Sequence, residues 1–223
     1  MFTVGMPIAG ELYFMYATML IAVPTGVKVF NWITTMYKGS LTFETPMLFS
    51  IAFVILFTFG GFTGLMLSIA AADMQYHDTY FVVAHFHYVM VAGAVFSGTA
   101  AIYYWLPKWC GKMYNETMGQ VQFWVAFIGF NIAFMPQHFL GLAGMPRRYA
   151  DYGLQFADWN MVSSIGAFIY GGAQIMLLYN VIATIRNGKP TTEEKTWEGA
   201  EGLEWTVPSP APYHTFAKPP EFK

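Results

Sequence analysis

The chain has 223 residues, of which 56% are hydrophobic and only 11% charged, with a formal net charge of −2. Soluble domains carry roughly 25% charged residues, so this chain has too little charge to cover a water-facing surface. The small net charge also argues against nucleic acid as a partner. The single cysteine, Cys110, excludes an internal disulfide framework and a zinc site built from several thiolates.

Five apolar segments are each near or above the ~20 residues that a membrane-spanning helix needs. In chain order they cover residues 12–36, 46–72, 80–106, 120–142 and 160–185. Pro107 is expected to end the third segment, and Pro136 is expected to kink the fourth. We therefore predict an all-α fold, a polytopic bundle of five transmembrane helices within residues 1–190. A polar, proline-rich tail over residues 191–223 is expected to pack at the inner surface.

The distribution of charge between alternate loops predicts the orientation of the bundle. One side carries the basic residues Lys38, Lys108, Lys112, Arg186 and Lys189. The other side carries Asp73, Asp78, Arg147, Arg148, Asp151 and Asp158. Because basic loops favour the inside, the first side and the tail are expected to face the cytoplasm or matrix. Arg147 and Arg148 break this trend, which suggests an anionic ligand at the outer surface.

Two histidines, His85 and His87, lie inside the third apolar segment, where ionisable groups are costly and usually functional. Residues i and i+2 of a helix are about 200° apart, so these side chains point to opposite faces. They cannot bind one metal together, but they can bind two. Since imidazole is a usual axial ligand of heme iron, we predict two hemes flanking one helix, with Phe86 between them. The alternative is a pair of core histidines hydrogen-bonded to neighbouring helices.

Charged residues at the outer ends of the segments form two further candidate sites. His77 and Asp78 could share a hard metal ion with water, although such a dipeptide also suits a solvated helix start. Arginine pairs bidentately with carboxylates, so Arg147 and Arg148 could bind the propionates of the predicted hemes. The alternative for the two arginines is contact with lipid headgroups.

Lys28 is an isolated charge in the first apolar segment. A lysine at mid-membrane costs roughly 2.5–3.5 kcal/mol, so it should face a wet cavity or a partner. Thr25 lies three residues earlier on the same face and could relay protons to it. We predict a proton path through these two residues, and the alternative is that Lys28 snorkels to the inner surface. His138, near Pro136, is expected to have a structural role.

Four motifs resemble the catalytic subunit (subunit I) of heme–copper cytochrome c oxidase. They are PTGVKVF at residues 24–30, HDTYFVVAHFHYV at 77–89, PQHFLGLAGMPRRY at 136–149 and LEWTVPSPAPYHTF at 203–216. The resemblance runs essentially end to end, in the order of that family. It implies that the five segments are the last five of that subunit's twelve helices.

The resemblance implies a role for each heme-associated residue and for the heme type, heme A. His85 is similar to the proximal ligand of the high-spin heme that binds oxygen. His87 is similar to an axial ligand of the low-spin heme. Arg147 and Arg148 match the arginines that bind the heme propionates.

The same resemblance assigns the remaining charged candidates. His77 and Asp78 match the magnesium-site positions of the family. Lys28 and Thr25 match its lysine proton pathway. The family's adjacent copper-ligand histidines come immediately before the position of Met1, so copper is expected in the full subunit with no ligand from this chain.

The activity implied is the reduction of O2 to water with electrons from cytochrome c, coupled to proton translocation. The implied partners are the upstream half of the same subunit, a copper-bearing subunit II and other oxidase subunits, cytochrome c, and the lipid bilayer. The implied location is a bacterial cell membrane or the mitochondrial inner membrane. Without the upstream copper ligands, the chain alone is expected to be inactive.

Two other classes of protein remain open from the residues alone. A transporter or proton channel could use the histidines and Lys28 as an intramembrane relay, and it would contain no heme. An electron-transferring cytochrome could bind two low-spin hemes, and after reduction it would not bind carbon monoxide.

Overall fold

The structure is a computed structural model that describes residues 1–191, 196–216 and 218–220. Part of the predicted tail, residues 192–195, 217 and 221–223, lies outside these described residues. Five helical spans are long and apolar enough to cross a membrane, which confirms the predicted fold class and a membrane location. The spans are α1 (Ile8–Met36), α2 (Thr45–Ser68), α4 with α5 (Tyr80–Met90 and Ser97–Cys110), α6 (Glu116–Leu142) and α7 (Ala157–Asn187).

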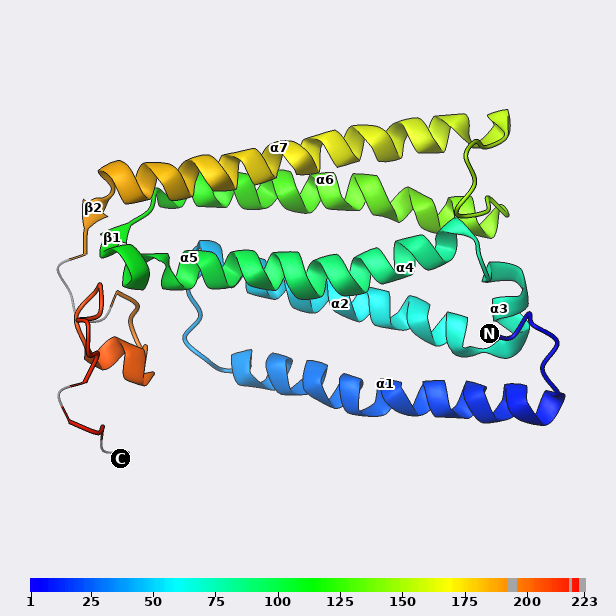
Figure 1. Cartoon of the computed structure of the whole chain (residues 1–223), viewed down its shortest axis with the longest axis horizontal. Helices are drawn as coiled ribbons and strands as arrows, with labels where there is room; N and C mark the ends of the chain where they lie inside the picture. Colours follow the sequence, from blue (N-terminus) through cyan, green and yellow to red (C-terminus); the bar gives the residue numbers. More distant parts are fainter. Residues whose placement is uncertain (192–195, 217, 221–223) are drawn as a thin grey trace.

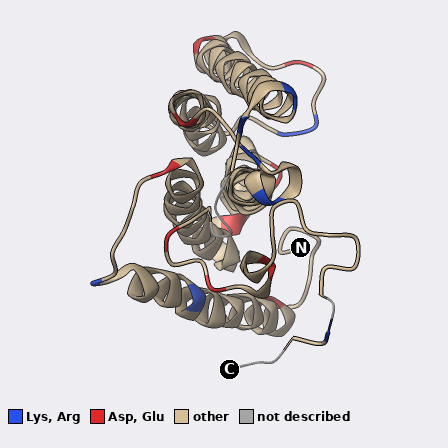
Figure 2. Cartoon of the chain, turned by 90° about the vertical axis from the view of Figure 1, so that its left-hand side faces the viewer, with Lys and Arg blue, Asp and Glu red and all other residues tan. Residues whose placement is uncertain are grey.

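The spans lie side by side in the order α1, α2, α4–α5, α6, α7, and each packs mainly on its neighbours in the chain (Figure 1). Viewed along the helices, they form a curved layer with α1 and α7 at its two edges (Figure 2). We call the end with residues 37–44, 111–115, 188–191 and 196–216 the tail end. The opposite end, with residues 69–79 and 143–156, is the arginine end.

Short elements connect the spans at both ends. At the arginine end, α3 (Ala70–Tyr76) follows a break at Ile69, so the second span ends earlier than the predicted residue 72. At the tail end, β1 (Lys112–Met113) pairs antiparallel with β2 (Lys189–Pro190). This pairing joins the chain segments that follow α5 and α7.

Two features of the third span depart from the prediction. The helix does not stop at Pro107 but continues to Cys110, and it ends at Gly111, whose φ of +67° suits glycine. Between α4 and α5 the backbone forms a π-helical segment, Val91–Phe96, without interrupting the span. Proline is also accommodated in α6, which runs through Pro136 to Leu142.

Aromatic side chains fill the interior between α2, α5 and α6. Buried members of this core are Phe49, Phe96, Tyr103, Phe123 and Phe130. The edge helix α1 differs, because it has no buried residue. The bundle core therefore lies in the other four spans, and α1 contributes mainly a wall against α2.

The described part of the tail packs against the end of α5. Lys108 is only 6% exposed, and its Nζ donates to the carbonyl oxygens of Val207 (2.6 Å) and Pro208 (3.0 Å). Trp205 is buried beside it, with the Lys108 Nζ 5.6 Å from the centre of its ring. These contacts fix the tail on the bundle at this end.

Candidate functional site

His85 projects from α4 toward α2. Its Nδ1 lies 2.9 Å from the backbone oxygen of Gly60 and 3.2 Å from Oγ1 of Thr63. A backbone carbonyl can only accept, so the Gly60 contact places the ring proton on Nδ1. Nε2 then carries the free lone pair, which is the arrangement that metal-ligating histidines usually adopt.

The His85 ring lines a cavity of about 460 Å³ between α1 and α2. Ligand cavities in proteins usually measure about 300–1,000 Å³ and are mostly apolar. Here the apolar wall includes Val29, Phe30, Phe57, Phe62, Leu65 and Val89. An apolar cavity with one accessible imidazole suits a large, flat, metal-containing group such as heme.

Gly64 brings the backbone of α2 against the His85 ring. A β-carbon at this position would lie only 2.7 Å from Cε1 of His85. Any other residue would push the ring or the helix aside, so the glycine helps to set the position of the imidazole. Sequence reasoning missed this contact, because Gly64 and His85 are far apart in the chain.

His87 leaves α4 toward α6. Its ring stacks on Phe134 with ring centres 4.1 Å apart and an angle of 17° between the planes. Its Nδ1 lies 2.7 Å from the backbone oxygen of Val83, which leaves the Nε2 lone pair free as in His85. The two imidazoles therefore face different helices, as their spacing requires. Their service as axial ligands stays a prediction.

Phe86, predicted to lie between two hemes, contacts residues of the site. Its ring stacks against His87 with ring centres 4.6 Å apart. The guanidinium carbon of Arg147 lies 5.9 Å from the centre of the Phe86 ring, within the range of a cation–π contact. Phe86 therefore links the intramembrane histidine to the arginine end.

Asp78 joins the charged candidates at the arginine end. One carboxylate oxygen lies 3.7 Å from Nε of Arg147 and 3.9 Å from Nη1 of Arg148, and the other lies 3.2 Å from Nε2 of His77. The Arg147 amide also donates to the backbone oxygen of Asp78 at 2.8 Å. The four residues that the sequence singled out at this end thus form one cluster.

The predicted magnesium site is not complete in the described part of the chain. No group of three or more His, Cys, Asp or Glu side chains there is placed to hold a metal ion. Asp73, which the sequence analysis did not assign to the site, lies 3.8 Å from Nδ1 of His77, at the i, i+4 spacing that could have revealed it. Burial raises the pKa of the Asp73 carboxyl, and His77 opposes this shift. Magnesium binding by His77 and Asp78 stays a prediction.

The proton-path candidates on α1 are separated by the structure. Thr25 lines the His85 cavity, and its hydroxyl donates to the backbone oxygen of Ile21 at 2.9 Å. Lys28 is exposed and is not among the residues that line this cavity. The structure therefore brings Thr25, but not Lys28, to the cavity of His85.

His138 packs among aromatic rings. It is 5% exposed, and it makes edge-to-face contacts with Phe59 and Phe81 at ring-centre distances of 5.5 and 5.4 Å. Its Nδ1 lies 3.3 Å from the backbone oxygen of Met135. These contacts agree with the structural role expected for it.

Five helices long and apolar enough to cross a membrane define the chain as a polytopic helical membrane protein, and its third span carries two imidazoles that face different helices. Residues 1–169 match the sequence model of the family described as "Cytochrome C and Quinol oxidase polypeptide I". The chain belongs to this family.

Curated relatives are similar over nearly the whole chain. The cytochrome c oxidase subunit 1 of Cereibacter sphaeroides is 51% identical over 99% of this chain, which covers 39% of that protein. The corresponding subunit of Bacillus sp. (strain PS3) is 52% identical over 99% of the chain, which covers 36% of it. The chain therefore spans less than two fifths of the length of these relatives.

A solved structure shows the same fold. It is a heme-copper terminal oxidase dimer, which matches with a TM-score of 0.74 at 18% identity, over 85% of this chain and 39% of the solved chain. At this identity the likeness bears on the fold alone.

Proposed function

We propose that the chain is the C-terminal part of the catalytic subunit of a cytochrome c oxidase, which reduces O2 to water with electrons from cytochrome c and translocates protons. The observation that carries the proposal is the arrangement of His85 and His87, which share one helix and direct free Nε2 atoms to opposite sides. Its relatives, at 51% and 52% identity, bear the name of that subunit.

In this proposal His85 holds the high-spin heme A and His87 holds the low-spin heme A. The Gly60 and Val83 carbonyls keep the ring protons on Nδ1, so that each Nε2 is available to iron. Phe134 stacks on the His87 ring and sets its plane, and Gly64 leaves room for the His85 ring and helps to set its position. When bound, the hemes supply the redox chemistry, while the protein orients them and controls the access of water.

The arginine end then serves the outer side of both hemes. Arg147 and Arg148 are the proposed partners of the heme propionates. Asp78 lies close to both guanidinium groups and helps to hold them in place. The Phe86 ring contacts the Arg147 guanidinium group through a cation–π interaction. His77 and Asp78 are the proposed protein ligands of magnesium, with the further ligands supplied from outside this chain.

The proposed proton path enters through α1. Thr25 faces the His85 cavity and can pass a proton through its hydroxyl. Lys28 lies about one helical turn from Thr25, so the proposal requires the Lys28 side chain to approach a polar group of the assembled oxidase. Copper would be held by the upstream half of the subunit, and subunit II would pass electrons from cytochrome c.

A difference spectrum of membranes that contain this chain with its upstream half tests the proposal. Reduced-minus-oxidised spectra should show two heme A signals, of which one responds to carbon monoxide. No heme signal in a well-folded assembly would contradict the proposal and favour the transporter. Two heme signals that are both unchanged by carbon monoxide would favour an electron-transferring cytochrome.

A further inference from the structure

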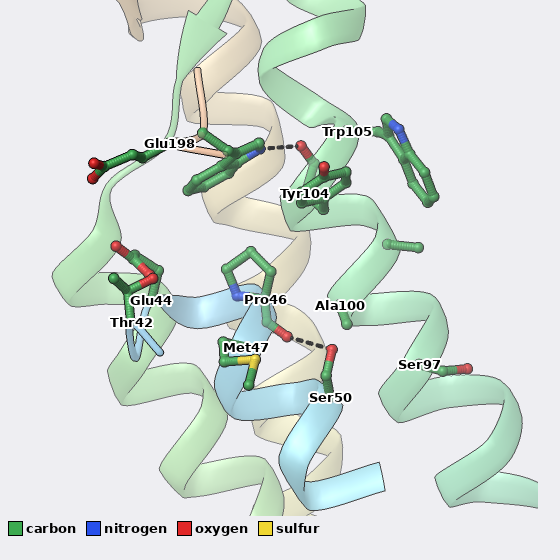
Figure 3. A pocket seen from close by; sticks show the side chains of 12 residues that line it. Thr42, Glu44, Pro46, Met47, Ser50, Ser97, Ala100, Tyr104, Trp105 and Glu198 are labelled. Carbon is green, nitrogen blue, oxygen red and sulfur yellow. Dashed lines mark hydrogen bonds between the residues drawn. The ribbon is translucent and has the colours of Figure 1, made fainter. Parts of the chain in front are cut away.

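We propose that the tail end carries a phospholipid-binding site, selective for an ammonium headgroup such as that of phosphatidylethanolamine. The site is a second cavity of about 460 Å³, separate from the cavity that His85 lines. It lies between α2, α5 and the tail (Figure 3). The residues that define its chemistry are Glu44, Ser97, Tyr104, Trp105, Trp197 and Glu198.

The cavity changes in polarity with depth. Its mouth lies beside Glu44, which directly precedes α2, and Glu198 of the tail. The deeper wall combines Met47 and Ala100 with Ser50 and Ser97, and the two serine hydroxyls are already used, because they donate to the backbone oxygens of Pro46 and Gly93. From Trp105 down to Ser97 the wall follows α5 over eight residues, a depth of about 12 Å. A polar mouth above an apolar groove matches a headgroup followed by the start of an acyl chain.

Aromatic side chains place the mouth at the membrane interface. Tryptophan and tyrosine concentrate where the hydrocarbon region meets the headgroups. Trp197 is firmly held there, because its indole Nε1 donates to the backbone oxygen of Tyr104 at 2.8 Å. The rings of Trp197 and Tyr104 also stack, with centres 5.8 Å apart and planes 8° apart. The aromatic wall of the cavity is therefore formed before any ligand binds.

The charge at the mouth selects the headgroup. Within the described residues, no lysine, arginine or histidine nitrogen forms an ion pair with Glu44 or Glu198. Lys108 is nearby in α5, but its Nζ is held by the Val207 and Pro208 carbonyls. Two carboxylates on the lining of a cavity that also contains Tyr104, Trp105 and Trp197 attract an ammonium group and repel an anionic headgroup.

The experiment measures lipid binding to the assembled oxidase that contains this chain. The delipidated complex is titrated with dioleoyl phosphatidylethanolamine or dioleoyl phosphatidylglycerol in mixed micelles, and bound lipid is counted by native mass spectrometry. The test variant is Glu44→Gln with Glu198→Gln. The control is Glu201→Gln, an exposed tail residue that does not line the cavity. The heme spectrum of each sample verifies assembly.

The proposal predicts one phosphatidylethanolamine site that the double variant weakens at least about threefold and the control leaves unchanged. Phosphatidylglycerol should not compete for that site. Equal binding of phosphatidylethanolamine by wild type and double variant would overturn the proposal, as would equal binding of the two lipids. Protein side chains filling the cavity in a structure of the assembly would overturn it as well.

Discussion

The His85 ring packs against α2 at Gly64, where a β-carbon would lie 2.7 Å from Cε1. Replacing Gly64 with alanine should therefore displace the imidazole and shift or weaken the carbon-monoxide-sensitive heme signal of the assembled oxidase. The measurement is the carbon monoxide difference spectrum. Gly171→Ala is the control, because a β-carbon there would meet nothing within 4 Å. An unchanged spectrum in the Gly64 variant would contradict the packing argument.

Asp78 contacts two arginines, but its side chain is 53% exposed. Ion pairs in such surroundings contribute only about 0–1 kcal/mol. Asp78→Asn should therefore lower the unfolding temperature of the assembly only slightly. The drop should agree, within about 2–4 °C, with the drop caused by the exposed control variant Asp151→Asn. Thermal unfolding followed by heme absorbance measures this. A drop of 10 °C would show that the cluster stabilises the fold.

The residue types and spacings predicted part of the site. Because i and i+2 positions diverge on any helix, the opposite directions of His85 and His87 follow from the sequence alone. The partner of the His85 Nδ1 does not follow from the sequence. The Gly60 carbonyl lies 25 residues from His85, and only the packing of α2 against α4 brings the two together.

At the scale of elements, α6 and α7 pack closely through glycines. A β-carbon at Gly129 would lie 2.6 Å from the backbone nitrogen of Tyr170. Gly129→Val should force the two helices apart and cost about 1–3 kcal/mol. Thermal unfolding of the assembled oxidase should show the loss, whereas Gly172→Ala on α7 should not, since its position is open. Equal unfolding temperatures for both variants would contradict this account.

The tail is held by Lys108. Replacing Lys108 with methionine should leave the Val207 and Pro208 carbonyls without their donor, at a cost of about 1–3 kcal/mol. Hydrogen exchange of residues 196–210 should then be about tenfold faster, as mass spectrometry would detect. Lys38→Met, at an exposed lysine outside this contact, is the control. Unchanged exchange in the Lys108 variant would mean that other contacts hold the tail.

The five spans were predictable because a bilayer demands long apolar helices, and all five are present. The details inside them were not. Pro107 lies within α5 rather than after it, and the π-helical segment Val91–Phe96 has no signal in the apolar pattern. The break at Ile69 could not be predicted either, because an apolar residue at this position is typical of a continuing span.

At the scale of the whole molecule, α1 buries no residue and packs mainly on α2. The His85 cavity lies between these two helices, so one wall of the candidate heme site depends on α1. The chain spans 39% and 36% of two of its relatives. In the proposed oxidase, the upstream half of the subunit should pack on α1 and complete the surroundings of this cavity.

We propose that one helix holds two hemes on opposite faces, and separate substitutions of its histidines test this most directly. In the assembled oxidase, His85→Ala should abolish the carbon-monoxide-sensitive heme signal and retain the low-spin signal. His87→Ala should abolish the low-spin signal and retain the carbon-monoxide-sensitive signal. Difference spectra of both variants, at matched amounts of assembled protein, decide the matter. A carbon-monoxide-sensitive signal that survives in His85→Ala would contradict the account.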